Sequence, residues 1–192
     1  MERRPRRSLS CSTVRPMNES LRGQLLVAAP VLHDPNFRRT VVLVAEHGDE
    51  GAMGLVLNRP TDTSVGDVLP DLAPLAGEEE AVFVGGPVAL ESVLALAELE
   101  YPGDASEILF GSIGFVQEPD VAVLRGRVFV GYAGWSAGQL EAELEEESWL
   151  VLPAETEDVF SNDPDGLWSA VLRRQGGQYA LLALMPPDPS LN

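Results

Sequence analysis

The sequence predicts an α+β fold, a single compact domain with a large mixed β-sheet and a few packed helices. Three observations predict it. Short apolar runs of strand composition recur along the chain and outnumber the segments with helical periodicity. Residues 127–152 have the pattern of a strand, a helix and a second strand in succession. With 192 residues, 45% of them hydrophobic, the chain is long enough to bury one sizeable core.

Residues 127–152 are the expected centre of this fold. Val128, Val130 and Tyr132 alternate with other apolar residues, which is typical of a buried strand. Gly134 and Trp135 are expected to end that strand.

A helix should follow this strand. Ser136 and Gln139 fit a capping box, in which each side chain accepts a hydrogen bond from the amide of the other residue. The helix has one apolar stripe, formed by Ala137, Leu140 and Leu144. Residues 149–152 return as a strand, which Pro153 ends.

Five strands and one short helix are expected before this unit. The strands are residues 25–29, 40–45, 54–58, 81–84 and 91–97. The second and third should pair as an antiparallel hairpin across a long polar loop, Glu46 to Gly51. Ser64 and Asp67 indicate the start of a short helix whose inward residues are Val65, Val68 and Leu69. Residues 112–116 and 121–124 are short apolar segments without an assigned partner.

Two helical segments and a last strand are expected after it. Residues 156–160 should form one or two helical turns. Asp163 is a good cap for a second helix, because Pro164 follows it at the first helical position. The buried stripe of that helix is Leu167, Trp168, Val171 and Leu172. Gly176-Gly177 should end the helix, and residues 179–185 should form the last strand.

Charge is distributed very unevenly along the chain. Residues 1–16 hold five of the 13 arginines and one acidic residue. The remainder carries 8 arginines and 29 acidic residues, a net charge of −21, and there is no lysine. We expect residues 1–16 to be a disordered Arg-rich tail, or to lie upstream of a start at Met17, with the alternative that they bind nucleic acid or an acidic partner. Residues 17–192 are then the single domain.

The composition also limits the functional class. An acidic body repels phosphate backbones, so direct nucleic-acid binding is disfavoured. With Cys11 as the one cysteine and His33 and His47 as the two histidines, no familiar ligand set forms, and we expect no metal and no cofactor. No apolar run approaches the roughly 20 residues that span a bilayer. Because the N-terminus lacks the apolar stretch of a secretory signal, we expect a cytoplasmic protein without membrane contact.

Seven stretches of the chain carry a family resemblance. They are GQLLVAAP (23–30), DPNFRRTVV (34–42), EHGDEGAMGLVLNRP (46–60), VFVGGPV (82–88), GYAGWSAGQLEAEL (131–144), WLVLPA (149–154) and the pair Phe160 and Trp168. In this order they resemble the YqgE/AlgH family of bacterial proteins, whereas residues 98–126 match it poorly. The resemblance implies a compact α+β domain with a large mixed sheet. It implies no established molecular function, since the family label of transcriptional regulator rests on indirect effects.

Polar residues of the matching stretches flank the expected strands and form the candidate binding site. We expect one shared surface made by Asp34, Arg39, His47, Asn58, Arg59, Gly85 and Gly86. Strand alternation should give Arg39 a defined direction. Arg59 is suited to a carboxylate or phosphate, or else to a surface ion pair. The Gly85-Gly86 turn either exposes amides to an anion or is a tight structural turn.

No residue is assigned a catalytic role. Glu46 and His47 could act as an acid–base pair, but neighbours on a strand point to opposite faces. His47 is instead expected to bond a loop carbonyl or to face solvent. The three tryptophans, Trp135, Trp149 and Trp168, either build a ligand pocket or anchor helices to the sheet.

Three functional hypotheses follow. The first is a non-enzymatic binding or regulatory module that acts through a protein partner or a small metabolite. The second is an orphan enzyme with a polar cleft around Asp34, Arg39, His47 and Asn58, which requires these side chains to converge within hydrogen-bonding reach. The third is direct DNA binding, against which the charge argues and for which no helix-turn-helix pattern is found. We rank them in that order.

The charge distribution makes a testable prediction. Protein that begins at Met17 should show no salt-sensitive binding to duplex DNA, because its net charge of −21 repels the phosphate backbone. Fluorescence anisotropy with a labelled duplex, between about 50 and 200 mM salt, measures this. Tight binding that weakens steeply as salt increases contradicts the prediction.

Overall fold

The computed structural model describes residues 20–118 and 121–185, so the expected tail at residues 1–16 lies outside the described residues. Ten strands form one sheet that does not close. They are β1 (Gln24–Ala28), β2 (Val41–Gly48), β3 (Gly51–Val56), β4 (Pro60–Ser64), β5 (Ala81–Val84), β6 (Val88–Leu99), β7 (Glu107–Phe110), β8 (Ile113–Phe115), β9 (Val123–Ser136) and β10 (Trp149–Pro153). The helices are α1 (Val65–Val68), α2 (Ala73–Ala76), α3 (Gln139–Glu145), α4 (Thr156–Val159), α5 (Pro164–Gln175) and α6 (Gly177–Leu182).

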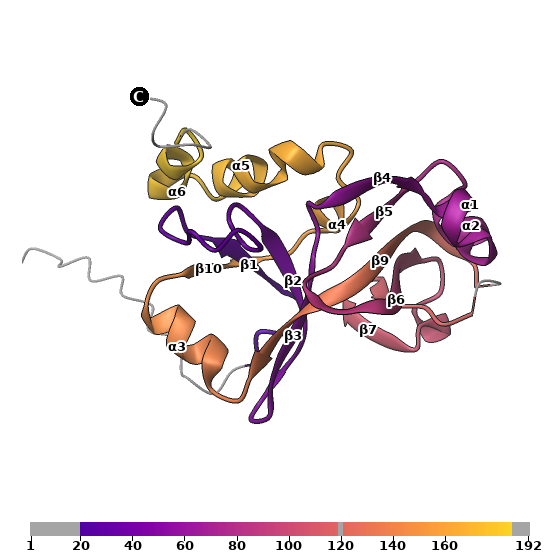
Figure 1. Ribbon diagram of the computed structural model, residues 1–192, viewed down its shortest axis with the longest axis horizontal. Helices are drawn as coiled ribbons and strands as arrows, with labels where there is room; N and C mark the ends of the chain where they lie inside the picture. The colour runs from indigo at the N-terminus through magenta and orange to yellow at the C-terminus, as the bar shows by residue number, and fades with distance from the viewer. Residues whose placement is uncertain (1–19, 119–120, 186–192) are drawn as a thin grey trace, which may run out of the picture.

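The strand order is β10-β1-β2-β3-β9-β6-β8-β7, and β4 pairs with β5, which in turn pairs with β9 (Figure 1). The β5–β9 pair is parallel, while the other pairs are antiparallel. The sheet is therefore mixed, and the predicted α+β class with a single domain is confirmed. No helix among the described residues is long and apolar enough to cross a membrane.

Strand β9 is the central element, as the sequence predicted for this region. Its residues 133–136 pair with β3, and residues 129–130 pair with β5. Along most of its length it also pairs with β6. The predicted end at Gly134 and Trp135 is wrong: both residues continue the ladder, opposite Met53 and Ala52 of β3.

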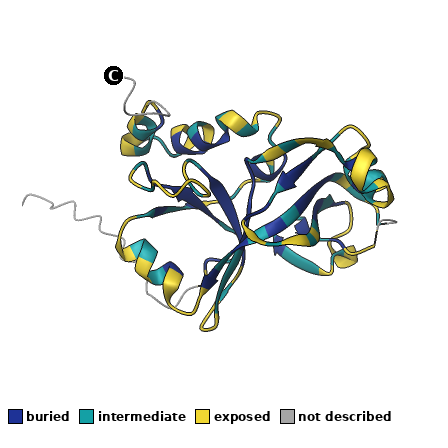
Figure 2. Cartoon of the chain, viewed as in Figure 1, coloured by how far each residue is buried: buried dark blue, intermediate teal, exposed yellow. Residues whose placement is uncertain are grey.

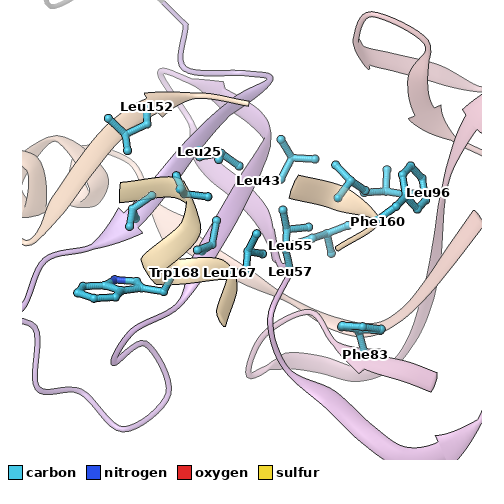
Figure 3. Close-up of a cluster of buried hydrophobic side chains, with 14 of the residues drawn as sticks. Leu25, Leu43, Leu55, Leu57, Phe83, Leu96, Leu152, Phe160, Leu167 and Trp168 are labelled. Atoms are coloured by element: carbon cyan, nitrogen blue, oxygen red, sulfur yellow. The ribbon is translucent and has the colours of Figure 1, made fainter. Parts of the chain in front are cut away.

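Helices cover both faces of the sheet at β1 and β2. Leu25 and Val27 belong to the larger core with the buried stripe of α5, whereas Leu26 and Ala28 pack with Leu140 of α3. Alternate residues of β1 thus face two different helices, which explains why the strand is apolar at every position from Leu25 to Ala28. Figure 3 shows the α5 side of this core, and Figure 2 shows the buried strands between more exposed helices.

Helix α3 and the tryptophans are held by side-chain hydrogen bonds. Trp135 and Trp149 both donate their indole N–H to Oε2 of Glu143, at 2.9 and 2.7 Å. The indole of Trp168 donates to the carbonyl of Ala28 at 2.8 Å. The tryptophans therefore anchor helices to the sheet. Only half of the predicted capping box forms: Gln139 accepts from the amide of Ser136, but the N-cap position belongs to a glycine, Gly138.

The predicted last strand is wrong. Residues 177–182 form helix α6, and Tyr179, Leu182 and the C-cap residue Ala183 pack against the larger core. A spacing of three and four residues is helical, but over so short an apolar run it resembles a strand. The segment is also rich in alanine and leucine, which favour helix.

Three smaller predictions are also wrong. The β2–β3 hairpin has a two-residue turn at Asp49 and Glu50 instead of a long loop, because both strands extend into the polar segment. Val68 is 53% exposed and does not face inward. Arg39 does not lie on a strand: its φ is +55°, in a left-handed turn before β2 begins.

Gly85 follows β5 directly and allows the backbone there to pass close to β9. Its amide donates to the carbonyl of Val130 at 2.9 Å, and its carbonyl accepts from the amide of Val56 at 2.8 Å. A Cβ at this position would lie 2.4 Å from the carbonyl oxygen of Gly131. The backbone approach therefore requires glycine.

We expect Gly85→Ala to destabilise the fold by about 3 kcal/mol or more, because the clashing atom belongs to a buried backbone that cannot move aside. Gly48→Ala is the matched control, since a Cβ at Gly48 meets nothing within 4 Å. That control should change the free energy of unfolding by about 1 kcal/mol or less. Urea denaturation of both variants measures the difference, and equal stabilities contradict the prediction.

Candidate functional site

Four of the residues expected to form a site meet at one end of the sheet. Asp34 and Arg39 lie in the loop between β1 and β2, and Asn58 and Arg59 follow β3. The loop and the end of β3 are joined by backbone and side-chain hydrogen bonds, starting with the amide of Leu57, which donates to the carbonyl of Val41 at 2.8 Å.

Asn58 ties the two segments together. It is buried, its Oδ1 accepts from the amide of Val41 at 3.0 Å, and its Nδ2 donates to the carbonyl of Arg39 at 2.9 Å. Both ends of the amide are thus engaged by the backbone of one turn. Asn58 therefore positions this corner of the molecule rather than presenting a side chain to a ligand.

Asp34 shapes the same turn from its other end. Its carboxylate accepts from the amide of Asn36 at 2.8 Å, and its carbonyl accepts from the amides of Phe37 and Arg38 at 3.0 and 2.8 Å. This local pattern is an Asx turn that runs into a short helical turn. Asp34 thereby helps to fix the direction in which Arg38 and Arg39 leave the loop.

Arg39 packs on the last two helices. Its guanidinium carbon lies 4.4 Å from the centre of the Trp168 ring, a cation–π arrangement, and Nη2 donates to the carbonyl of Met185. Burial, with the neighbouring charge of Arg38 as the second cause, lowers the pKa of Arg39 below its ordinary value. The partial loss of solvent and the neighbouring cation therefore both disfavour the charge of Arg39.

Arg59 reaches across the same turn. Its Nη2 donates to the carbonyl of Arg38 at 2.6 Å and its Nη1 to the carbonyl of Asn58 at 3.2 Å. Burial lowers the pKa of Arg59, and the opposing effect of Asp165 is smaller. The alternative of a surface ion pair for Arg59 is not what the described residues show, because its partners are carbonyl groups.

We call Arg38, Arg39 and Arg59 the arginine corner. Of the eight arginines in the described residues, four form ion pairs with carboxylates, namely Arg22, Arg125, Arg127 and Arg174. Within the described residues the arginine corner makes none, although acidic residues are abundant. Arg38 was not among the predicted site residues, since nothing local distinguishes it from Arg39.

Gly85 and Gly86 lie beside the corner but have structural roles. The amide of Val84 donates to the carbonyl of Arg59 at 2.8 Å, which brings this turn next to the end of β3. The amide of Gly85 is occupied by Val130, as described above. A Cβ on Gly86 would lie 2.1 Å from the backbone of Tyr132. Close packing of backbone, and not an exposed amide, accounts for both glycines.

His47 lies away from the other predicted residues. It pairs with Ala52 near the turn of the β2–β3 hairpin, six residues along β2 from Val41, which corresponds to about 20 Å of extended chain. The polar cleft required by the enzyme hypothesis, with His47 beside Asp34, Arg39 and Asn58, is therefore not formed.

Both ring nitrogens of His47 are engaged. Nδ1 accepts from the amide of Leu21 at 3.2 Å, so Nε2 carries the proton and donates to Glu141 at 2.9 Å. The expectation that His47 bonds a loop carbonyl or faces solvent is wrong. Because the acceptor nitrogen already receives an amide, His47 has no lone pair with which to act as a base.

A cleft of about 610 Å³ lies on the His47 side of the sheet. Its acidic lining includes Glu46, Asp49, Glu50 and Glu107, of which Glu107 pairs with Arg22 at 2.6 Å. Among residues 20–118 and 121–185, no group of three or more His, Cys, Asp or Glu side chains is arranged to hold a metal ion.

The fold and the corner define a single-domain α+β protein that carries a cluster of cations on an acidic body. The model of the AlgH-like family matches residues 25–180, most of the chain. The chain therefore belongs to the AlgH-like family, as the sequence resemblance indicated.

Relatives and solved structures agree with this assignment. The chain is 50% identical to a UPF0301 protein of Streptomyces coelicolor, over 90% of this chain and 96% of that protein. The crystal structure of a Corynebacterium diphtheriae protein matches with a TM-score of 0.80 at 30% identity, covering 89% of this chain and 95% of that one. The solution structure of AlgH from Pseudomonas aeruginosa matches with a TM-score of 0.67 at 33% identity, covering 90% and 97%. None of these names states an activity.

The geometry of Asn58 yields a prediction. We expect Asn58→Ala to lower the free energy of unfolding by about 1–3 kcal/mol, because it leaves the buried amide of Val41 and carbonyl of Arg39 without partners. Asn36→Ala, at an exposed position of the adjoining turn, should change it by about 0.5 kcal/mol or less. Chemical denaturation measures both, and an unaffected Asn58→Ala variant contradicts the role given to this side chain.

Proposed function

We propose that the protein is a non-enzymatic binding module, acting in the cytoplasm, whose arginine corner takes an anionic group of a partner protein or a small metabolite. One observation carries the proposal: three arginines lie together at one corner, and the guanidinium groups of Arg39 and Arg59 have carbonyls as their hydrogen-bond partners in the described residues. Asp34, Asn58, Gly85 and Gly86 contribute by positioning this surface, and Arg38 joins the predicted Arg39 and Arg59 in contacting the ligand.

The energetics favour an incoming anion. Burial lowers the pKa values of Arg39 and Arg59, and the charge of Arg38 lowers the pKa of Arg39 further, so both charged forms are less stabilised than in water before a ligand arrives. A carboxylate or phosphate would give these cations a charged acceptor in place of a neutral carbonyl, and hydrogen bonds between two charged groups are shorter and stronger. Guanidinium is well suited to this, since its donors match both anions in a fork.

The acidic body does not prevent such binding. At physiological ionic strength, exposed charges are largely screened beyond about 8 Å, so the charges close to the corner dominate. The same body still repels a long phosphate backbone, which meets many acidic residues at once. A regulatory effect on transcription would then be indirect, through the bound partner.

An enzymatic function is less well supported. The candidate base, His47, has both nitrogens occupied and lies apart from the corner. The remaining corner residues are guanidinium groups, which can stabilise negative charge but do not take up a proton at neutral pH.

The proposal is tested by titrating the full chain with glutarate and with inorganic phosphate while recording amide NMR spectra. The amides of residues 36–40 and those of Asn58 and Arg59 should respond. Arg59→Gln and Arg38→Gln should weaken the binding about tenfold or more, the effect of losing a contact of at least about 1.4 kcal/mol. Thermal melts should confirm that both variants remain folded.

Arg173→Gln is the matched control. Arg173 is exposed on α5, and its substitution removes the same unit of charge at another place on the surface. It should bind as the unaltered chain does. Equal losses in all three variants would mean that net charge alone decides binding. That outcome contradicts the proposal, as does the lack of any response at the corner to either anion.

A further inference from the structure

The end of α6 exposes apolar side chains next to the arginine corner. Leu181 is 69% exposed, Leu184 72% and Met185 43%. Arg39 donates to the carbonyl of Met185, so the two surfaces are continuous. Figure 2 shows the exposed positions on α6, beside the loop that joins β1 and β2.

Helix α6 and the turn that follows it have two sides. Tyr179, Leu182 and Ala183 pack against the larger core, while Leu181 and Leu184 point elsewhere. A single exposed leucine is ordinary, but three large apolar side chains within five residues form a patch. Polar residues at these exposed positions would make the protein more soluble. The apolar side chains there are instead typical of a surface that binds a partner.

We infer that the arginine corner and this patch together bind a short acidic segment of a partner protein that also carries apolar side chains. The inference rests on the proposed function and narrows its ligand class. Carboxylates of the segment would bond Arg38 and Arg59, and its apolar side chains would cover Leu181 and Leu184. We choose an acidic segment because its charge complements the three cations, which lack carboxylate partners among the described residues.

A peptide fits this surface better than a free metabolite does. Arg38 and the two leucines are open to solvent, whereas small-molecule sites bury about 70–90% of their ligand. An extended or helical segment gains its affinity from several anchors spread over an open surface. The segment must be short, because the acidic body repels a second large anionic surface within about 8 Å.

The test begins with selection of random peptides displayed on phage against the full chain. Synthetic copies of the enriched peptides are then titrated into the chain by calorimetry. We expect enrichment of Asp and Glu together with Leu, Ile or Phe. Arg59→Gln and Leu184→Ser should each weaken the leading peptide about tenfold or more, and Arg173→Gln should leave it unchanged. Polyglutamate of the same length should bind at least tenfold more weakly.

The possible failures are distinguishable. If Arg59→Gln weakens binding while Leu184→Ser does not, or if polyglutamate binds equally well, the peptide inference fails and the anion site of the proposed function survives. If Arg38→Gln and Arg59→Gln both leave the binding of the peptide, of glutarate and of phosphate unchanged, both fail. Enrichment of basic or neutral peptides overturns the inference. A lack of enrichment also overturns the inference, and it is the result expected if residues 186–192 cover the patch. Self-association of the chain, measured by sedimentation and abolished by Leu184→Ser, overturns it as well.

Discussion

The backbone pairing of β9 is the constraint on which the rest of the structure depends. One strand forms ladders with β3, β5 and β6, so the two parts of the sheet are joined through it. The parallel contact with β5 requires backbone to pass closely over backbone, which Gly85 permits by lacking a Cβ. Because β5 also holds the carbonyl of Arg59, this crossing fixes the end of β3 from which the arginine corner is built.

The corner is assembled in layers. The sheet sets the positions of β2 and β3, Asn58 joins the loop before β2 to the residue after β3, and the arginines extend from that joined backbone. Trp168 then anchors α5 to β1 and provides the ring on which Arg39 stacks. Each layer is held by buried apolar contacts or by satisfied backbone groups, so the cations need not hold the fold together themselves.

Much of the fold could be predicted from the sequence, because most strands are short apolar runs between glycine, proline and polar residues. Residues 81–84 match β5 at both ends, and Asp163 caps α5 with Pro164 at its first turn as predicted. The sequence was misleading where local signals are weak. The apolar run at 179–185 suits both a helix and a strand, and β4, which consists of a proline and four polar residues, has no apolar pattern at all.

The site was harder to predict for a different reason. Asp34, Arg39, Asn58 and Arg59 were identified from their positions at strand ends, and those ends do meet. His47 was placed with them because residues 46–51 were expected to form a loop. In the structure β2 continues to Gly48 and carries His47 away from the other residues. The amide contacts of Asn58 and the two-sided engagement of His47 join residues 17 to 94 positions apart, and no local pattern encodes such contacts.

One residue, Asn58, positions the corner, and other residues are proposed to contact the ligand, which has an evolutionary consequence. Asn58 fixes the geometry through two hydrogen bonds of a buried side chain, whereas Arg38 is exposed and the two hydrogen bonds of Arg59 are exposed or part-buried. Mutations at these arginines are therefore tolerated by folding, while a mutation at Asn58 is not. Descendants of one ancestral sequence can thus acquire different ligands on an unchanged framework, and likeness of framework between two members is weak support for likeness of ligand.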